Sequence, residues 1–351
     1  MSSPRPDEPG QPAGLTAQPA YYTVRDERLV CTLCPHGCVL ADGESGICGV
    51  RTNRSGILTL PFYARASALN IDPIEKKPLY HFHPGSGIVS IGFLGCNFRC
   101  PFCQNYSISQ QTAHPTEHVP PERLVRIAND SRSAAGADRQ PPVVGIAYTY
   151  NEPSIHFEYV TEAARLARDA GLKNVLVTNG HLNPSPAREV LALIDAVNVD
   201  LKSISDEFYR HEIGGSLKAV MKFIEIASET THAEVTTLLL PGRNDSDGSI
   251  DTIARFVASL DPEIPLHLSA YRPAYRYSDP ATSDETLLHA VEVARAHLRY
   301  VYPGNIASEA STPCTACGAL LVRRRGYHVD RSGLQAGHCT SCGAASPIVD
   351  A

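Results

Sequence analysis

The sequence lacks three features that mark common classes of protein. No run of residues approaches the roughly 18 apolar positions of a membrane-spanning helix, and the N-terminus has no basic region followed by an apolar core, so we expect no secretory signal. Positive charge is not in excess, because 31 Lys and Arg face 37 Asp and Glu, for a formal net charge of −6. This balance argues against a nucleic-acid partner recruited by bulk charge. We therefore expect a cytoplasmic protein that binds neither a membrane nor nucleic acid.

Cysteine is the residue whose number and placement are unusual. Eleven cysteines are an odd number for a disulfide framework, and they fall into three groups instead of being scattered. Thiols clustered at ligand spacing, in a chain without a secretory signal, are typical of metal sites in a reducing compartment. The three groups therefore carry the functional hypotheses.

The middle group lies on a loop that follows an apolar stretch at residues 88–94. Its members are Cys96, Cys100 and Cys103, spaced Cys-x3-Cys-x2-Cys. Three thiolates on one short turn can hold three corners of an iron–sulfur cubane, whereas the usual site takes four cysteines. The missing fourth ligand would leave one iron open to an outside molecule, as a catalytic zinc keeps one position open. A zinc loop or redox-sensing thiols are the alternatives, although no neighbouring residue through Asn105 is an obvious fourth zinc ligand.

The N-terminal group places four thiols within eighteen residues. Its members are Cys31, Cys34, Cys38 and Cys48, separated by Gly37, Gly43 and Gly46. The glycines permit the positive φ that a tight metal-binding loop needs. A structural zinc and a second iron–sulfur cluster both fit this spacing, and unliganded buried cysteines are the remaining alternative.

The C-terminal group consists of two Cys-x2-Cys knuckles, each followed by glycine. Its members are Cys314, Cys317, Cys339 and Cys342. Two such knuckles, separated by an apolar hairpin-like stretch, predict a zinc ribbon with a closed four-cysteine site. So small a segment needs its metal to fold. We expect the run Arg323-Arg324-Arg325 to form a solvated face of the hairpin.

Residues 88–302 alternate apolar runs with amphipathic stretches, the pattern of repeated β–α units around a parallel sheet. Six repeats are too few for a closed eight-stranded barrel, so we expect an α/β fold with a partial (β/α)6 barrel of the TIM type. The expected strands are 88–94, 143–149, 173–178, 196–200, 234–240 and 264–269. The expected helices are 121–131, 153–170, 185–194, 216–229, 249–259 and 283–297. The expected division is a disordered tail (1–20), a Cys-rich module with a connector (21–87), the partial barrel (88–305) and the zinc-ribbon tail (306–351).

Polar residues follow these strands, at the carboxyl ends where such sheets collect their chemistry. Asn151 and Glu152 follow the second strand, and Pro153 suits the first turn of a helix, so Glu152 can either cap that helix or bind a cationic ligand. Asp200 and Lys202 end the fourth strand on one face. Two opposite charges on an interior face must pair with each other or bind a ligand.

These motifs together resemble the radical S-adenosylmethionine enzymes. The Cys-x3-Cys-x2-Cys spacing, with Phe102 before the third cysteine, is similar to the signature of that superfamily. The order of the motifs at successive strand ends resembles the glycyl-radical-enzyme activases, exemplified by the pyruvate formate-lyase activating enzyme. The segment 95–105, the Tyr-Asn-Glu-Pro motif and the Cys-Pro-His-Gly-Cys module are similar to the AmmeMemoRadiSam-system radical enzymes. The resemblance covers roughly residues 30–345.

The resemblance implies an oxidoreductase of the activating-enzyme type. Its [4Fe-4S] cluster, on Cys96, Cys100 and Cys103, would bind S-adenosylmethionine at the open iron and cleave it reductively to a 5′-deoxyadenosyl radical that abstracts hydrogen. Flavodoxin or ferredoxin would supply the electron, and a glycine of a partner protein would be the leading target. A small molecule or another protein is the alternative target. The residues implied at the cofactor are Asn151, Glu152, Asp200 and Lys202.

The chain also departs from the activase pattern. Tyr150-Asn151-Glu152-Pro153 replaces Gly-Gly-Glu-Pro, Thr236 stands where the pyruvate formate-lyase activase has an arginine, and the later histidine is replaced near Arg272. These departures concern the glycine target more than the cofactor chemistry. A rival hypothesis is a multi-metal binding module for nucleic acid or protein, without turnover. The zinc ribbon and the arginine run favour it, whereas the net negative charge and the polar strand ends oppose it.

Overall fold

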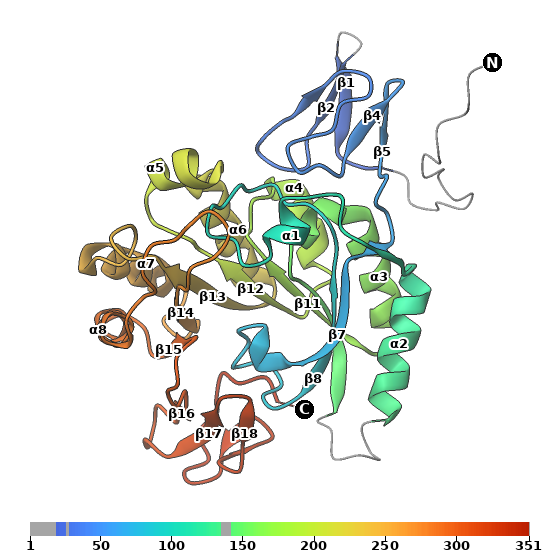
Figure 1. Cartoon of the computed structure of the whole chain (residues 1–351). Coiled ribbons are helices and arrows are strands. Elements are labelled where there is room, and N and C mark those ends of the chain that lie inside the picture. The colour runs from blue at the N-terminus through green and yellow to red at the C-terminus, as the bar shows by residue number, and fades with distance from the viewer. Residues whose placement is uncertain (1–18, 26–27, 135–141, 351) are drawn as a thin grey trace, which may run out of the picture.

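The computed structural model describes residues 19–25, 28–134 and 142–350, and an eight-stranded sheet forms its centre (Figure 1). Across the sheet the strands are β15 (Val301–Gly304), β14 (Leu266–Ala270), β13 (His232–Leu239), β12 (Ala196–Asp200), β11 (Lys173–Thr178), β10 (Val143–Tyr148), β8 (Gly87–Gly92) and β7 (Ala68–Pro73). All neighbours pair in parallel except β7, which runs antiparallel to β8. The strands β7 and β15 lie at opposite edges, so the sheet is an open, partial barrel, as predicted.

The six expected strands are confirmed, and the sheet gains one further strand at each edge. The extra strand β7 lies within the expected connector, and β15 follows the last expected helix. Pairing of β8 with β7 on one side and with β10 on the other places the strand before the cluster cysteines inside the sheet. The loop that holds those cysteines therefore leaves from a strand that is buried along its whole length.

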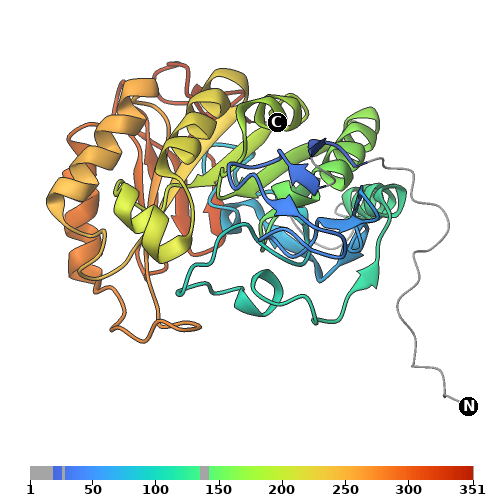
Figure 2. The ribbon, with the colours of Figure 1, turned by 90° about the horizontal axis from the view of Figure 1, so that it is seen from above.

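Amphipathic helices cover the outer face of the sheet (Figures 1 and 2). They are α2 (Pro121–Ala134), the short helix η2 (Pro153–His156) continued by α3 (Phe157–Asp169), α4 (Pro184–Leu191), α6 (Leu217–Thr230), α7 (Asp247–Leu260) and α8 (Asp284–Arg295). Ser216, Ser246 and Ser283 cap the last three helices, because each hydroxyl accepts a hydrogen bond from the backbone three residues on. Short helices α1 (Tyr106–Ser109), α5 (Asp206–Phe208) and η3 (Tyr209–Ile213) lie in loops at the carboxyl ends of the strands. None of the described helices is long and apolar enough to cross a membrane.

Residues 74–86, which we call the plug, occupy the inner face of the sheet. The plug begins with the helical turn η1 (Ile74–Lys76), and its apolar side chains pack on small inward-facing residues of the strands. The contacts join Ile74, Leu79 and Phe82 to Ile88, Ala147, Val175 and Ala196. Because Ala147 and Ala196 are small, they leave room for the plug inside the partial barrel.

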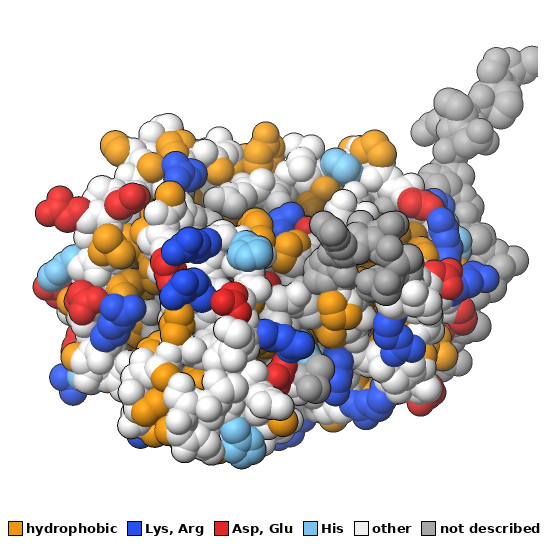
Figure 3. All heavy atoms as spheres, turned by 90° about the horizontal axis from the view of Figure 1, so that it is seen from below, with side chains coloured by type: hydrophobic (Ala, Val, Ile, Leu, Met, Phe, Trp, Pro, Cys, Tyr) orange, Lys and Arg blue, Asp and Glu red, His pale blue; other side chains and the backbone are white. Residues whose placement is uncertain are grey.

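The C-terminal tail lies against the plug, at the bottom of Figure 1. Its strands are β16 (Thr312–Pro313), β17 (Leu320–Arg325), β18 (His328–Asp330), β19 (Leu334–Gln335) and β20 (His338–Cys339). Backbone hydrogen bonds tie Val349 to His81 and His83, each at 2.8 Å. Figure 3 shows this end of the molecule from below, where basic, acidic and apolar side chains are interspersed.

The expectation that all three arginines of β17 are solvated is wrong for the middle one. Arg324 is 1% exposed, donates to the carbonyl of Tyr80 and to Thr312 Oγ1, and lies 4.5 Å from the centre of the Tyr80 ring. Alternation along the strand directs Arg323 and Arg325 outward, where both pair with Glu309. The tail therefore docks on the barrel through a buried cation.

The N-terminal module lies above the carboxyl ends of the strands (Figures 1 and 2). It contains β1 (Tyr22–Arg25), β2 (Arg28–Cys31), β3 (Val39–Leu40), β4 (Thr52–Arg54) and β5 (Ile57–Thr59), while β6 (Arg65–Ala66) pairs with β9 (Glu117–His118). Buried Arg51 anchors the module, since its guanidinium contacts both carboxylate oxygens of Glu158 on α3 at 2.8 and 3.0 Å. The tail predicted to be disordered comprises residues 1–20, and its residues 1–18 fall outside the described residues.

Candidate active site

A cavity of about 660 Å³ opens at the carboxyl ends of the parallel strands. Its volume is typical of sites for cofactors and small molecules. The residues predicted to hold the radical chemistry line this one cavity. They are Cys96, Cys100, Cys103, Asn151, Glu152, Asp200 and Lys202. The structure thus brings together side chains from three strand ends that lie up to about a hundred residues apart in the sequence.

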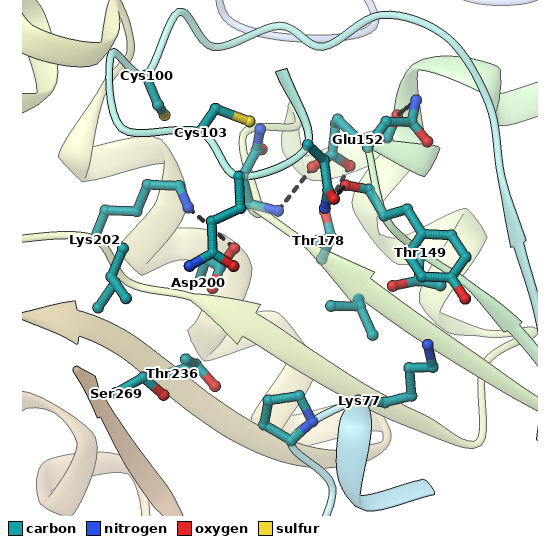
Figure 4. A pocket seen from close by; sticks show the side chains of 18 of the residues that line it. Lys77, Cys100, Cys103, Thr149, Glu152, Thr178, Asp200, Lys202, Thr236 and Ser269 are labelled. Atoms are coloured by element: carbon teal, nitrogen blue, oxygen red, sulfur yellow. Dashed lines mark hydrogen bonds and ion pairs between the residues drawn. The ribbon is translucent and has the colours of Figure 1, made fainter. Parts of the chain in front are cut away.

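The cluster loop (residues 95–105) carries three cysteines that line the cavity, and Figure 4 shows Cys100 and Cys103 on one side of it. The Cys96 sulfur accepts hydrogen bonds from the Phe98 amide at 3.3 Å and from Asn179 Nδ2 at 3.7 Å. Burial raises the pKa of Cys100 to about 12 and raises that of Cys96 well above its usual range. Free thiolates are therefore disfavoured here, and cationic iron would compensate for their burial. The donor set fits an iron–sulfur cluster with one open corner.

Asn151 fixes the start of the cluster loop. Its Oδ1 accepts a hydrogen bond from the Phe93 amide at 2.9 Å, and its Nδ2 donates to the carbonyl of Gly95 at 2.9 Å. Both polar groups of this side chain thus engage the backbone just before Cys96. Asn151 acts on the loop from the end of the neighbouring strand.

Glu152 lies at the wall of the cavity and is 1% exposed. Its carboxylate accepts hydrogen bonds from the amide of Ser154 at 3.0 Å, from Thr178 Oγ1 at 2.7 Å and from the amide of Asn179 at 2.7 Å (Figure 4). Burial raises the pKa of Glu152, although the hydrogen bonds from Asn179 and Thr178 oppose the shift. A carboxylate has about four acceptor positions, so one remains after these three bonds. Capping of η2 and contact with a cationic ligand are compatible.

Asp200 and Lys202 lie on the side of the cavity opposite Glu152 (Figure 4). They form an ion pair, with Lys202 Nζ 3.0 Å from Asp200 Oδ2. Burial acts to lower the pKa of Lys202, but the Asp200 carboxylate outweighs it and holds that pKa above its usual range. The two alternatives from the sequence therefore coincide, because the residues form an ion pair and line the cavity at once. The pair offers a ligand both an acceptor and a donor.

Comparison with known proteins assigns the family. Residues 90–257 match the family model described as the Radical SAM superfamily. This stretch begins in β8 and contains the three cysteines of the cluster loop, Asn151, Glu152, Asp200 and Lys202. The chain belongs to the radical SAM superfamily.

Relatives extend this radical SAM assignment. An uncharacterized protein of Methanocaldococcus jannaschii is 36% identical over 342 residues, which cover 94% of this chain and 98% of that protein. A putative glycyl-radical enzyme activating enzyme of the same organism is 27% identical, covering 51% of this chain and 72% of that protein. The crystal structure of Streptococcus suis SuiB bound to S-adenosylmethionine has a TM-score of 0.51 and 13% identity, covering 64% of this chain and 51% of that chain. The last likeness concerns the fold alone.

We call the side of the cavity formed by Thr236, His267 and Ser269 its inner half. It contains a histidine that the sequence analysis did not select. His267 lines the cavity, and its Nε2 lies 2.6 Å from Glu234, which is fully buried. The Glu234 carboxylate also accepts hydrogen bonds from the amides of Tyr80 and His81 in the plug. Both residues lie on predicted strands, so assigning the inward-facing side of each strand would have found them.

The plug supplies a second group of charges to the radical SAM cavity. Lys77 Nζ lies 2.7 Å from Asp72, which also accepts a hydrogen bond from Tyr150 at 2.5 Å. Burial acts to raise the pKa of Asp72, but hydrogen bonds from Lys76 and Lys77 outweigh it and lower that pKa. Tyr150 has a left-handed backbone conformation, with φ 71°. No local motif in the sequence predicts this contact, because Asp72 of β7 and Tyr150 are 78 positions apart.

The two four-cysteine groups of this radical SAM protein differ in their spacing. In the tail, the sulfurs of Cys314, Cys317, Cys339 and Cys342 all lie within 4.8 Å of one another, close enough for a single metal ion. Within the described ranges, no other group of three or more His, Cys, Asp or Glu ligands is so compact. In the N-terminal module, the thiols of Cys31, Cys38 and Cys48 are near enough to add to the effect of burial, which raises the pKa of Cys34 to about 12.

Proposed function

We propose that the protein is a radical SAM enzyme that binds a [4Fe-4S] cluster through Cys96, Cys100 and Cys103 and reductively cleaves S-adenosylmethionine. The observation that carries the proposal is that one cavity joins these three cysteines, with no fourth cysteine among its described lining residues, to Glu152 and to the Asp200–Lys202 pair. When bound, the cluster and S-adenosylmethionine supply a 5′-deoxyadenosyl radical that abstracts hydrogen. The protein supplies position, charge and exclusion of water.

The residues of the chain have distinct tasks in this proposal. The remaining acceptor position of Glu152 receives a hydrogen bond from the cationic amino group of S-adenosylmethionine. Asp200 and Lys202 contact the polar part of the same molecule, while Asn151 holds the cluster loop in place. Replacing Glu152 by Gln should weaken binding of S-adenosylmethionine about 10- to 100-fold, because a charged hydrogen bond is lost. Glu225→Gln, at the exposed Lys222 pair, is the matched control.

The test of turnover is anaerobic reconstitution with iron and sulfide, followed by dithionite and S-adenosylmethionine. We expect 5′-deoxyadenosine from the wild type and only background from Cys100→Ala. Equal amounts of 5′-deoxyadenosine from both proteins would refute the enzyme hypothesis. The multi-metal binding module would then be the remaining hypothesis. Interspersed charges on the face in Figure 3 give that module little support as a nucleic-acid binder.

For the hydrogen donor, we favour a glycine of a partner protein. The similarity to a putative glycyl-radical enzyme activating enzyme supports this target. The reconstituted enzyme would be mixed with S-adenosylmethionine, reduced flavodoxin and candidate partners encoded nearby in the genome. The expected result is an EPR signal on one partner that disappears when its glycine is replaced by alanine.

A small molecule is the second candidate substrate, and the inner half of the cavity favours it. His267, Ser269 and Thr236 line the cavity and present polar groups to it, and Figure 4 shows Ser269 and Thr236 on the side opposite Cys100 and Cys103. If no partner acquires a radical, a small-molecule extract should raise 5′-deoxyadenosine formation in the wild type. His267→Asn should abolish that stimulation while leaving the unstimulated rate intact, because the residue lies in the inner half.

The tail is proposed to bind zinc. A tetrahedral ion held by four sulfurs at about 2.3 Å requires sulfur–sulfur separations of about 3.8 Å. The separations Cys314–Cys342 and Cys317–Cys339 are 3.8 and 3.7 Å, which supports a mononuclear site. Flavodoxin or ferredoxin is the proposed electron donor, and the cytoplasm, where thiols stay reduced, is the proposed compartment.

A further inference from the structure

We infer that the N-terminal module binds a second [4Fe-4S] cluster, closed by Cys31, Cys34, Cys38 and Cys48, which relays electrons to the cluster on Cys96, Cys100 and Cys103. The inference rests on the proposed function, because the relay needs an acceptor in the cluster loop. It assigns the module a redox task in place of a structural one. Three observations carry it: sulfur spacing, the environment of the sulfurs, and direct contact with the cluster loop.

Sulfur spacing separates the module from the tail. The tail has the compact spacing of a mononuclear site, with all four sulfurs within 4.8 Å. Across the described part of the chain, the module contributes no group of three ligands that is equally compact. A cubane demands a wider arrangement, because each sulfur binds a different iron. The three cysteines of the cluster loop likewise form no group as compact as that of the tail.

Two sulfurs of the module lie close to Gly46. A side chain at this glycine would place its Cβ 3.6 Å from the Cys38 sulfur and 3.7 Å from the Cys48 sulfur. The amide of Ile47 donates to the Cys38 sulfur at 3.5 Å. Hydrogen bonds to the sulfurs are one means by which a protein tunes the reduction potential of a cluster. Gly46 thus leaves space between two sulfurs that a larger residue would fill.

The module touches the cluster loop through residues adjacent to the ligands. The carbonyl of Cys48 would lie 2.4 Å from a Cβ placed on Gly95, so the two backbones are in close contact, and Gly95 has φ +84°, which suits glycine. His36 Nε2 lies 2.7 Å from the carbonyl of Asn97. Arg99 donates to the carbonyl of Ile47. Cys48 thus contacts the residue before Cys96, and Asn97 is the residue after it, so covalent and hydrogen-bonded paths join the two sites.

The relay balances as a sequence of one-electron steps. We call the cluster on Cys31, Cys34, Cys38 and Cys48 the closed cluster, and the cluster on Cys96, Cys100 and Cys103 the open cluster. A reduced flavodoxin- or ferredoxin-class donor loses one electron to the closed cluster. The closed cluster then returns to its oxidised state by reducing the open cluster. That electron cleaves one S-adenosylmethionine to methionine and a 5′-deoxyadenosyl radical. No proton or leaving group crosses between the clusters. The four cysteines of the module keep its cluster closed, so S-adenosylmethionine should not bind to it.

Metal content tests the identity of the site without turnover. The wild type, reconstituted with iron, sulfide and zinc, should hold about eight iron and one zinc per chain. The Cys96→Ser/Cys100→Ser/Cys103→Ser variant should keep about four iron, which isolates the module even if the proposed function fails. About four iron and two zinc in the wild type would overturn the inference, as would loss of all iron in the triple variant.

Spectroscopy of the wild type provides a second test that needs no substitution. After partial reduction, EPR should show two cluster signals, of which S-adenosylmethionine changes only one. A single signal, or two signals that both respond, would contradict a closed second cluster. This result also separates the two proposals, because a responding signal reports the open cluster alone.

The relay itself is tested by the rate of reduction of the open cluster. His36→Ala removes the contact with Asn97 while keeping all the cysteines, and should slow reduction by reduced flavodoxin about tenfold. Photoreduction by a small deazaflavin should be unchanged, since it needs no relay. His328→Ala, at an exposed position of β18 in the tail, is the control and should alter neither rate. Equal flavodoxin rates for His36→Ala and the wild type, together with equal rates for a Cys34→Ser protein, would rule out the relay.

Discussion

The two four-cysteine regions meet the barrel in different ways. The tail contacts the plug through the buried cation Arg324 and through backbone hydrogen bonds of Val349, and its own sulfurs are compact. The N-terminal module contacts the cluster loop backbone to backbone, and its four cysteines form no group as compact as that of the tail. A set of four cysteine ligands can therefore serve either the stability of a segment or the transfer of electrons. We expect damage to the tail to appear as lost stability, and damage to the module to appear as lost electron supply.

The largest expected effect is removal of metal from the tail. Cys339→Ser should abolish the zinc site and unfold residues 306–350, because structural zinc in small domains contributes about 10 kcal/mol or more. Limited proteolysis and zinc analysis would measure this change. Iron content should remain that of the wild type. A tail that resists protease without zinc would show that packing on the plug is sufficient.

Arg324→Met is expected to have the next largest effect. It leaves Glu75, which is buried and 3.8 Å from the guanidinium, without its cation, and breaking such a buried pair costs about 3–5 kcal/mol. Urea unfolding would give the change in free energy. Arg325→Met is the matched control, because its side chain is 70% exposed and should shift the midpoint far less. Similar shifts for both variants would contradict the docking role of Arg324.

Arg51→Met tests the anchor of the module in the same manner. The buried Glu158 carboxylate would lose both of its charged hydrogen bonds, and we expect a loss of about 3 kcal/mol. Arg54→Met, at an exposed position of β4, serves as the control. Unlike Arg324→Met, Arg51→Met should also slow reduction of the open cluster by flavodoxin. An unchanged rate would mean that the module keeps its contact with the cluster loop without Arg51.

The smallest expected effect is a pH dependence at the plug. The pKa of Asp72 is lowered in the folded protein, so its stabilising contribution is present above its unfolded pKa of about 3.9 and fades as pH falls towards the folded value. Asp72→Asn should therefore be less stable than the wild type at pH 6. The difference in urea midpoint should narrow between about pH 5 and pH 2. A constant difference over this range would exclude ionised Asp72 as the cause.

The sequence allowed the prediction of elements whose signals are local. Strands such as Lys173–Thr178 are marked by a short apolar core, here Val-Leu-Val, and the cysteine spacings are visible without any fold. Glu152 and the Asp200–Lys202 pair were found because a strand end brings polar residues to a known edge. The alternation rule also placed Asp200 and Lys202 on one face, as the structure shows.

The plug and the burial of Arg324 could not be predicted in this way. Ala147 and Ala196 look like ordinary strand residues, and nothing local reveals that their small size accommodates Phe82. Arg324 contacts Tyr80 across 244 positions of the sequence, a pairing that no motif encodes. His267 lies between these cases, since its strand was predicted but its partner Glu234 belongs to another strand.

Tyr327 gives the tail a reach beyond its own fold. It lies on the turn between β17 and β18, yet it also lines the cavity. The metal ion proposed for the tail would therefore shape one wall of the cavity in which a substrate would meet the radical. Scarcity of that ion in the growth medium should alter which molecules fit inside, with no change in the reacting groups.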